Sequence, residues 1–216
     1  MSTILEGHDT AKILIDKDEA LKIIKDTHLT EDTKQLILVL DHQFSFWEKD
    51  SRGKWKIDFA TYCGYGRNGI CDSTEKQEGD GRTPSGLYTL DKAFGIAGNP
   101  GSLMEYRQVT ENSYWSGEKE GYNTWEEVEP NTKDMSASEH LIDYEVPYKY
   151  VFNIDYNSHP AVYGKGSAIF LHCRKADTWK TGGCIAIGKE WMLHLLRRCN
   201  YGTKILILPS AQSEQA

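Results

Sequence analysis

The sequence has no hydrophobic run long enough to span a membrane. Its longest apolar stretches, residues 36–40 and 205–208, have the length of strands, whereas a membrane helix needs about 20 apolar residues. Residues 1–17 also lack the basic segment followed by an apolar one that marks a secretory leader. The printed sequence therefore predicts a chain without an integral membrane span and without an export signal of its own.

Positive charge is scarce as well. Lys and Arg number 25 against 32 Asp and Glu, which gives a formal net charge of −7. Nucleic-acid binding proteins carry a basic face that displaces counterions, so we expect no nucleic-acid partner. Hydrophobic residues make up 39% and charged residues 26%, as in an ordinary globular protein. The 216 residues suit one domain with short extensions.

Cysteine is sparse, which excludes a disulfide-dense scaffold. An odd count leaves at least one thiol unpaired. Cys63 and Cys71, eight residues apart in a glycine-rich segment, can close a small disulfide or remain free thiols. Cys199 has the spacing of an apolar helix face and is predicted to lie in the core. The five cysteines are Cys63, Cys71, Cys173, Cys184 and Cys199.

Apolar periodicity predicts a mainly β protein with a few short helices. An N-terminal capping pattern over residues 16–19 precedes a short amphipathic helix. A second helix is predicted from Trp191 to Cys199, with Gly202 ending it. Residues 63–82 are predicted to form a loop. Strands are predicted over residues 35–40, 43–49, 54–62, 86–90, 148–156, 167–172 and 203–208.

These elements divide the chain into three parts. Residues 1–33 form an N-terminal extension with a short helix, 34–209 the main domain, and 210–216 a flexible tail. Within the main domain, residues 99–147 form an insertion. Between Glu105 and Glu145 it holds eleven acidic and three basic residues, interleaved with tyrosine and tryptophan. This mixture favours a folded lid over a cleft; the alternative is a solvated acidic surface insertion.

One stretch combines the residue types of nucleophilic catalysis. A predicted strand delivers His172, and Thr181-Gly182-Gly183-Cys184 ends twelve residues later, before an apolar segment. Two glycines allow a tight turn whose N–H groups can converge as an oxyanion hole does. A thiolate is a strong nucleophile, and a nearby imidazole can take its proton. The residue types favour Cys–His acyl transfer, although such a spacing also arises by chance.

A metal site is the alternative for the same residues. His172, Cys173 and Cys184 lack a fourth ligand and the paired-cysteine spacing that zinc sites use. Cys173 can also serve as a resolving thiol for Cys184. We expect neither a metal ion nor an organic cofactor.

The stretch resembles the catalytic motif of the YkuD-type L,D-transpeptidases. In that family a histidine at a strand end precedes Ser/Thr-x-Gly-Cys and an apolar residue, and here His172 precedes Thr181-Gly182-Gly183-Cys184-Ile185. The similarity covers residues 35–208 and includes the segments RTPSGLY (82–88), SASEHL (136–141), YN (156–157) and GKGS (164–167). The resemblance implies a mainly β, β-sandwich-like catalytic domain with a few short helices and an active site under a lid-like insertion.

The resemblance also implies an activity on peptidoglycan. The thiolate would attack the bond after the L-centre of meso-diaminopimelate or L-lysine in a tetrapeptide stem, and D-alanine would leave. The side-chain amine of a second stem would then take the acyl group, giving a 3→3 cross-link. Alternatives are an L,D-carboxypeptidase, with water as the acceptor, and a cell-wall binding module without turnover. The substrate implies an extracytoplasmic location, and carbapenem-type β-lactams are the expected inhibitors.

Site residues follow from the resemblance by position. Cys184 is the expected nucleophile, His172 the general base, and the backbone carbonyl of Cys173 the group that orients the imidazole. The N–H groups of Gly183 and Cys184 are the expected oxyanion hole. Many members have a second histidine where this chain has Gly182, so one substrate contact is expected to be lost.

Substrate-binding residues are expected around this centre. Arg82 can contact a substrate carboxylate or brace its own loop, and Thr181 shapes the turn. The full expected set is Thr181, Gly182, Arg174, Tyr156, Asn157, His140 and Arg82.

Overall fold

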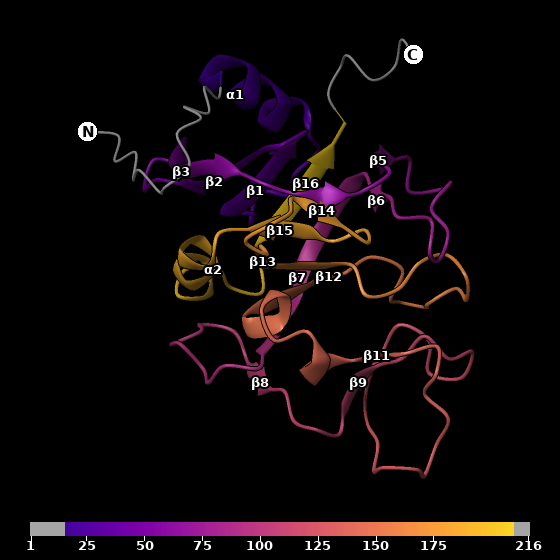
Figure 1. Ribbon diagram of the computed structural model, residues 1–216. Helices are drawn as coiled ribbons and strands as arrows, with labels where there is room; N and C mark the ends of the chain where they lie inside the picture. Colours follow the sequence, from indigo (N-terminus) through magenta and orange to yellow (C-terminus); the bar gives the residue numbers. More distant parts are fainter. Residues whose placement is uncertain (1–15, 210–216) are drawn as a thin grey trace.

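A single mixed β-sheet forms the centre of the protein (Figure 1). The computed structural model describes residues 16–209, so the expected tail and the first 15 residues of the extension lie outside it. The strands of the large sheet run in the order β15-β13-β12-β7-β16-β1-β2-β3, with β8 paired to β7. Their bounds are β1 Gln35–Leu40, β2 Gln43–Lys49, β3 Trp55–Tyr62, β7 Gly86–Gly95, β8 Tyr106–Gln108, β12 Val151–Ile154, β13 Phe170–Cys173, β15 Ile185–Ile187 and β16 Lys204–Leu208. The predicted mainly β class is confirmed.

Strand β7 belongs to both halves of this sheet. Its first residues pair with β16, and from Leu90 to Phe94 it pairs with β12. Side chains from the two halves meet in one core, where Phe44 of β2 and Leu171 of β13 are both fully buried. Burying a side chain of this size contributes about 1.5–3 kcal/mol. The sheet therefore folds over itself into the two layers of a β-sandwich.

The chain leaving β3 covers the outer edge of β15. Gly64 and Ala186 exchange backbone hydrogen bonds of 2.8 and 3.0 Å. A Cβ at Gly64 would lie 1.9 Å from the Trp179 carbonyl oxygen, so only glycine fits there. The predicted loop over 63–82 also contributes two-residue strands, β4 (Tyr65–Gly66) paired with β14 (Lys180–Thr181) and β5 (Ile70–Cys71) paired with β6 (Thr83–Pro84).

Within residues 16–209, two short α-helices cover the sandwich. The Asp16 carboxylate accepts hydrogen bonds from the first N–H groups of α1 (Lys17–Asp26), which packs Ala20 and Ile24 against the outer face of the sheet. The second helix, α2 (Lys189–Leu196), ends earlier than predicted, so Gly202 does not terminate it. Cys199 follows the helix and is buried in the core. Neither helix has the length and apolar character needed to cross a bilayer.

Two strands near the site, predicted over residues 148–156 and 167–172, are shorter than predicted. Residues 148–156 contribute only Val151–Ile154 to β12, because Pro147–Lys149 form the 3₁₀ turn η2. Strand β13 begins at Phe170 because Ala168 has a φ of +52°, which breaks the extended backbone. These interruptions direct Tyr148 and the Ala168 carbonyl toward the candidate site.

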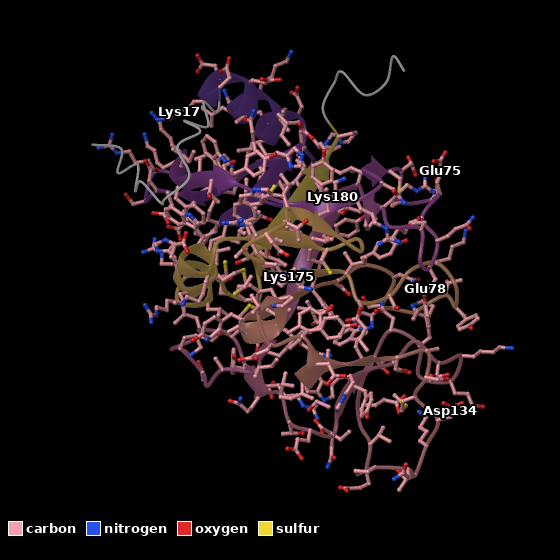
Figure 2. All side chains as sticks on the ribbon, viewed as in Figure 1. Lys17, Glu75, Glu78, Asp134, Lys175 and Lys180 are labelled. Atoms are coloured by element: carbon pink, nitrogen blue, oxygen red, sulfur yellow. The ribbon has the colours of Figure 1, made fainter. Side chains whose placement is uncertain are left out.

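The insertion is folded onto one end of the sandwich. Its centre is a three-stranded sheet in the order β10-β9-β11, followed by the 3₁₀ turn η1 (Leu141–Asp143). Trp115 of β9 packs against Phe170 of β13. Asp134 lies toward the outer end of the insertion, whereas Glu78 lies at the level where the insertion meets the sandwich (Figure 2). The strand bounds are β9 Ser113–Trp115, β10 Trp125–Glu127 and β11 Glu139–His140.

Candidate active site

Strand alternation places His172 and Cys184 on the same face of the sheet. Leu171 and Cys173 of β13 point into the core of the sandwich, so Phe170 and His172 point to the opposite face. Parallel pairing sets His172 opposite Ala186, which brings Cys184 level with Phe170. The two candidate catalytic residues are thus diagonal neighbours on adjacent strands, beneath the insertion.

His172 is held in one tautomer. Its Nδ1 atom lies 2.9 Å from the Cys173 carbonyl oxygen. A carbonyl only accepts, so Nδ1 carries the proton and the lone pair is on Nε2. Burial lowers the pKa of His172 to about 4, and the hydrogen bond to Cys173 offsets only part of this effect. The imidazole is therefore neutral near pH 7 and able to accept a proton at Nε2.

The Cys184 thiol is held against the start of β13. It donates to the Ala168 carbonyl at 3.2 Å and accepts from the Phe170 N–H at 3.4 Å. Burial and the Glu139 carboxylate raise the pKa of Cys184 to about 12. The described residues show no hydrogen bond between this thiol and His172. Both partners are neutral in this state, so the thiol must turn before it can give its proton to the imidazole.

The loop before Cys184 is held by hydroxyl groups. Thr181 Oγ1 donates to the Cys184 carbonyl at 2.7 Å and accepts from the Gly183 N–H at 3.1 Å. Thr83 Oγ1 donates to the Gly183 carbonyl at 2.7 Å. The Gly183 N–H, expected in the oxyanion hole, is thus engaged by Thr181 here. Within residues 16–209 the N–H of Cys184 has no hydrogen-bond partner.

A cavity of about 290 Å³ lies between the Cys184 loop and the insertion. Glu139 of β11 faces it from the insertion. Burial raises the pKa of the Glu139 carboxyl to about 7, and Glu78 adds to the shift, while a hydrogen bond from the Tyr148 hydroxyl opposes it. The cavity is lined by Arg67, Lys76, Glu78, Gly79, Trp115, Gly117, Ser136, Ala137, Ser138, Glu139, Ser167, Ala168, Ile169 and Gly182.

Tyr148 joins this carboxylate to the histidine. Its ring packs edge-on against the His172 imidazole with centroids 5.7 Å apart, and its hydroxyl donates to Glu139. Tyr148 is buried. The Tyr148 side chain thus contacts both the candidate base and the acidic wall of the cavity. The sequence analysis identified neither Tyr148 nor Glu139 as a site residue.

The insertion is fastened to the sandwich by two adjacent residues. Asn123 Oδ1 accepts from the Ala168 N–H at 3.0 Å, and its Nδ2 donates to the carbonyls of Tyr156 and Asn157. The Tyr122 hydroxyl donates to Glu78 and accepts from the Gly166 N–H. These contacts link residues far apart in the sequence, so no local pattern identified them.

Of the expected substrate-binding residues, Gly182 lines the cavity. Tyr156 is buried, and its hydroxyl donates to the Lys165 carbonyl at 2.7 Å. The Asn157 side chain binds the backbone of Val162 and Gly166 and shapes the turn between them. Thr181 holds the cysteine loop, as its expected role in shaping that turn requires.

The remaining three bind partners away from the cavity. Arg82 pairs with Asp80 and Glu75, so in this structure it braces its own loop. The Arg174 guanidinium lies 4.2 Å from the Trp179 ring centre. His140 stacks on Tyr114 within the insertion, and its Nε2 binds the Glu111 carbonyl.

The other cysteines form no disulfide. All five thiols are free and buried, and Cys63 and Cys71 are not joined in this structure. Cys173 Sγ lies 3.7 Å from the Tyr150 carbonyl, and burial raises its pKa to about 12. Residues 16–209 contain no cluster of three His, Cys, Asp or Glu side chains placed to hold a metal ion.

The sequence profile of the L,D-transpeptidase catalytic domain, the YkuD family, matches residues 34–207. The chain therefore belongs to this family. A comparison with curated proteins gave no match.

The chain is also similar to several solved structures. The helical cell shape determining protein Pgp2 of Campylobacter jejuni is 18% identical over 89% of this chain and 55% of its own, with a TM-score of 0.46. L,D-transpeptidase 1 of Mycobacterium tuberculosis is 10% identical over 81% and 61%, with a TM-score of 0.40. An L,D-transpeptidase of Enterococcus faecium is 15% identical over 81% and 50%, with a TM-score of 0.41. The chain spans about half the length of the first structures it matches.

Proposed function

We propose that this protein is a peptidoglycan L,D-transpeptidase that forms 3→3 cross-links through an acyl-enzyme on Cys184. The observation that carries the proposal is the state of His172. Its Nδ1–H is fixed on the Cys173 carbonyl and its Nε2 is free to accept a proton, on the same sheet face as Cys184. Membership of the L,D-transpeptidase family supports the choice of substrate class, for which we propose tetrapeptide stems with meso-diaminopimelate or L-lysine.

The first half-reaction makes a thioester. The Cys184 thiol leaves the Ala168 carbonyl and passes its proton to His172 Nε2 as the sulfur attacks the carbonyl carbon after the L-centre. The Cys184 N–H stabilises the oxyanion that forms. The C–N bond then breaks, and His172 returns its proton to the departing amine of D-alanine.

The second half-reaction releases the enzyme. The side-chain amine of an acceptor stem attacks the thioester carbonyl, and His172 removes a proton from this amine. The carbon–sulfur bond breaks, and the thiolate regains the proton from the imidazole. Gly182, two residues before Cys184, forms part of the cavity wall. Neither half-reaction calls for a metal ion or an organic cofactor.

The proposed substrate defines where the protein works. Peptidoglycan lies outside the cytoplasmic membrane, so the proposal places the protein in the cell wall or periplasm. By changing cross-linking there, it would influence cell shape, the role stated for the Campylobacter protein.

The test is intact-protein mass spectrometry on the wild type and on Cys184→Ala. A carbapenem should add stoichiometrically to the wild type and not to the variant. Stem tetrapeptides of both diamino acids should give cross-linked dimers and free D-alanine with the wild type alone. Tripeptide without dimers would indicate an L,D-carboxypeptidase, and binding without product or adduct would indicate a binding module. Turnover by Cys184→Ala would refute the mechanism.

A further inference from the structure

Ala168 has an unusual backbone conformation at the point where it meets the nucleophile. Its φ of +52° lies in the left-handed region, which is unfavourable for a residue with a Cβ. In this conformation its carbonyl oxygen accepts from the Cys184 thiol at 3.2 Å. Something outside β13 must therefore hold Ala168 in place.

The group that holds it is the carboxamide of Asn123. Oδ1 accepts from the Ala168 N–H at 3.0 Å and from Trp115 Nε1 at 2.8 Å, while Nδ2 donates to the carbonyls of Tyr156 and Asn157. Two acceptor and two donor positions are thus satisfied. Asn123 is only 7% exposed, so water cannot easily replace these bonds. Its own φ of +58° is one that asparagine tolerates.

We propose that Asn123 is a positioning residue for the Cys184 thiol. By fixing the Ala168 N–H, it aims the Ala168 carbonyl at the sulfur, so docking of the insertion controls how readily the thiol ionises and turns toward His172. The inference rests on the proposed nucleophilic role of Cys184. It does not depend on which stem peptide the enzyme uses.

The physical effect follows from the direction of the hydrogen bond. The thiol donates to Ala168, and a bond to the protonated form raises the pKa of the group that makes it. Releasing Ala168 removes this bond, while the Phe170 N–H, which favours the thiolate, remains. The other titratable groups facing Cys184 are Glu139, Tyr144, Tyr148 and Lys76, with His172 beside them on β13. Glu139 and Tyr144 belong to the same insertion as Asn123, so a change that only loosened the insertion would also reach the thiol, through Glu139. The experiment therefore needs a control that loosens the insertion and leaves the Ala168 N–H bound.

The experiment measures alkylation of Cys184 by iodoacetamide across pH, assigned by peptide mass. Asn123→Gly removes the carboxamide and accepts the positive φ, so the backbone is kept. Asn123→Asp keeps an oxygen that accepts from Ala168. Tyr122→Phe is the matched control, because it loosens the insertion at the adjacent residue without touching Ala168.

We expect alkylation of Cys184 at neutral pH to be roughly 3- to 10-fold faster in Asn123→Gly, which corresponds to a fall of about half a unit to one unit in the pKa of the thiol. Asn123→Asp and Tyr122→Phe should not speed the reaction. An unchanged rate in Asn123→Gly, or the same increase in all three variants, would overturn the proposal, because Asn123 would then act only by docking the insertion.

A measurement on the wild type decides the matter if Asn123→Gly does not fold. As urea is added, exchange of the Ala168 amide hydrogen and alkylation of Cys184 should both become faster. The two rates should depend on the urea concentration with the same slope. Different slopes would mean that the thiol becomes reactive without release of Ala168. Neither assay uses a stem peptide, so failure of the proposed activity and failure of this inference remain distinguishable.

Discussion

Thr83 and Gly183 are joined by a 2.7 Å hydrogen bond from the threonine hydroxyl to the glycine carbonyl, across 100 residues of sequence. The same hydroxyl accepts from the Gly66 N–H at 2.8 Å, and Thr83 is fully buried. One side chain therefore holds the residue before Cys184 and the short strand that pairs with the cysteine loop. The order of the loop depends on a motif that lies far from it in the sequence.

Thr83→Val should disorder the cysteine loop. The valine fills the same space but leaves the Gly183 carbonyl and the Gly66 N–H unpaired, which costs about 1–3 kcal/mol for each buried group. We expect a lower melting temperature and at least a 10-fold slower carbapenem acylation. Thr83→Ser keeps the hydroxyl and should acylate at close to the wild-type rate. Equal rates for valine and wild type would show that the loop is ordered without this bond.

Gly183 and Gly182 form a matched pair for substitution by alanine. Gly183 has a φ of +153°, and a Cβ there would lie 3.0 Å from the Arg82 carbonyl oxygen and 3.1 Å from Ile169 Cδ1. A Cβ at Gly182 meets no atom within 4 Å. Gly183→Ala should lose about 1–3 kcal/mol of stability and most of its acylation rate, whereas Gly182→Ala should change neither substantially. Urea unfolding and acylation kinetics of both variants check this, and a tolerated Gly183→Ala would contradict it.

Glu139→Gln should make Cys184 more reactive only at alkaline pH. The wild-type carboxyl, with its pKa raised to about 7, is charged above that pH, where it raises the pKa of the thiol. Glutamine carries no charge, and it still accepts from Tyr148. We expect roughly 3- to 10-fold faster alkylation near pH 8, falling to no difference near pH 5. The control variant is Glu126→Gln, which removes a half-buried carboxylate of the insertion that pairs with Lys133. A rate ratio independent of pH would rule out this electrostatic effect.

Stability should fall on the acid side because His172 is buried and neutral. Its pKa is lowered from 6.5 to about 4, so the unfolded state binds the proton more tightly. The stability is fully present above about pH 6.5 and is lost as the pH falls toward 4, by on the order of 3 kcal/mol. His172→Gln should flatten this dependence in urea unfolding between those pH values.

Glu139 changes the folding stability with pH in the opposite direction to His172, over an overlapping pH range. The pKa of Glu139 in the folded protein lies above the ordinary value of 4.5. The stability that its protonated carboxyl contributes is therefore present at low pH and is lost as the pH rises toward 7. The His172 comparison is therefore made in the Glu139→Gln background. A pH dependence that is the same with and without His172 would contradict the assignment.

Much of the sandwich could be predicted from the sequence because its strands carry their own signal. The apolar run of β1 and the hairpin of β2 and β3 lie where the pattern of residues placed them. Strand ends near the site were harder to predict. Pro147 and the left-handed Ala168 end the extended backbone, and the apolar pattern of the neighbouring residues does not reveal either interruption.

The candidate site divides in the same way. His172 and Cys184 belong to one short motif, and sequence reasoning brought them together before their geometry was known. Asn123 and Glu139 come from the insertion, and their contacts arise only when it packs on the sandwich. Arg174 and His140 are amphipathic side chains with aromatic partners nearby, Trp179 and Tyr114, which occupy them away from the cavity. The local sequence does not show whether such a side chain will bind its aromatic partner or face the cavity.

The bridge between Gly64 and Ala186 has a consequence for how a peptide can approach. Many proteins capture an extended ligand by letting it extend a sheet, which requires unpaired backbone groups along an outer strand. Here Gly64 already occupies that position beside β15, the strand that follows Cys184. If stem peptides are the substrate, as we propose, this position is closed to main-chain pairing with them, and the cavity would select them by the chemistry of their side branches.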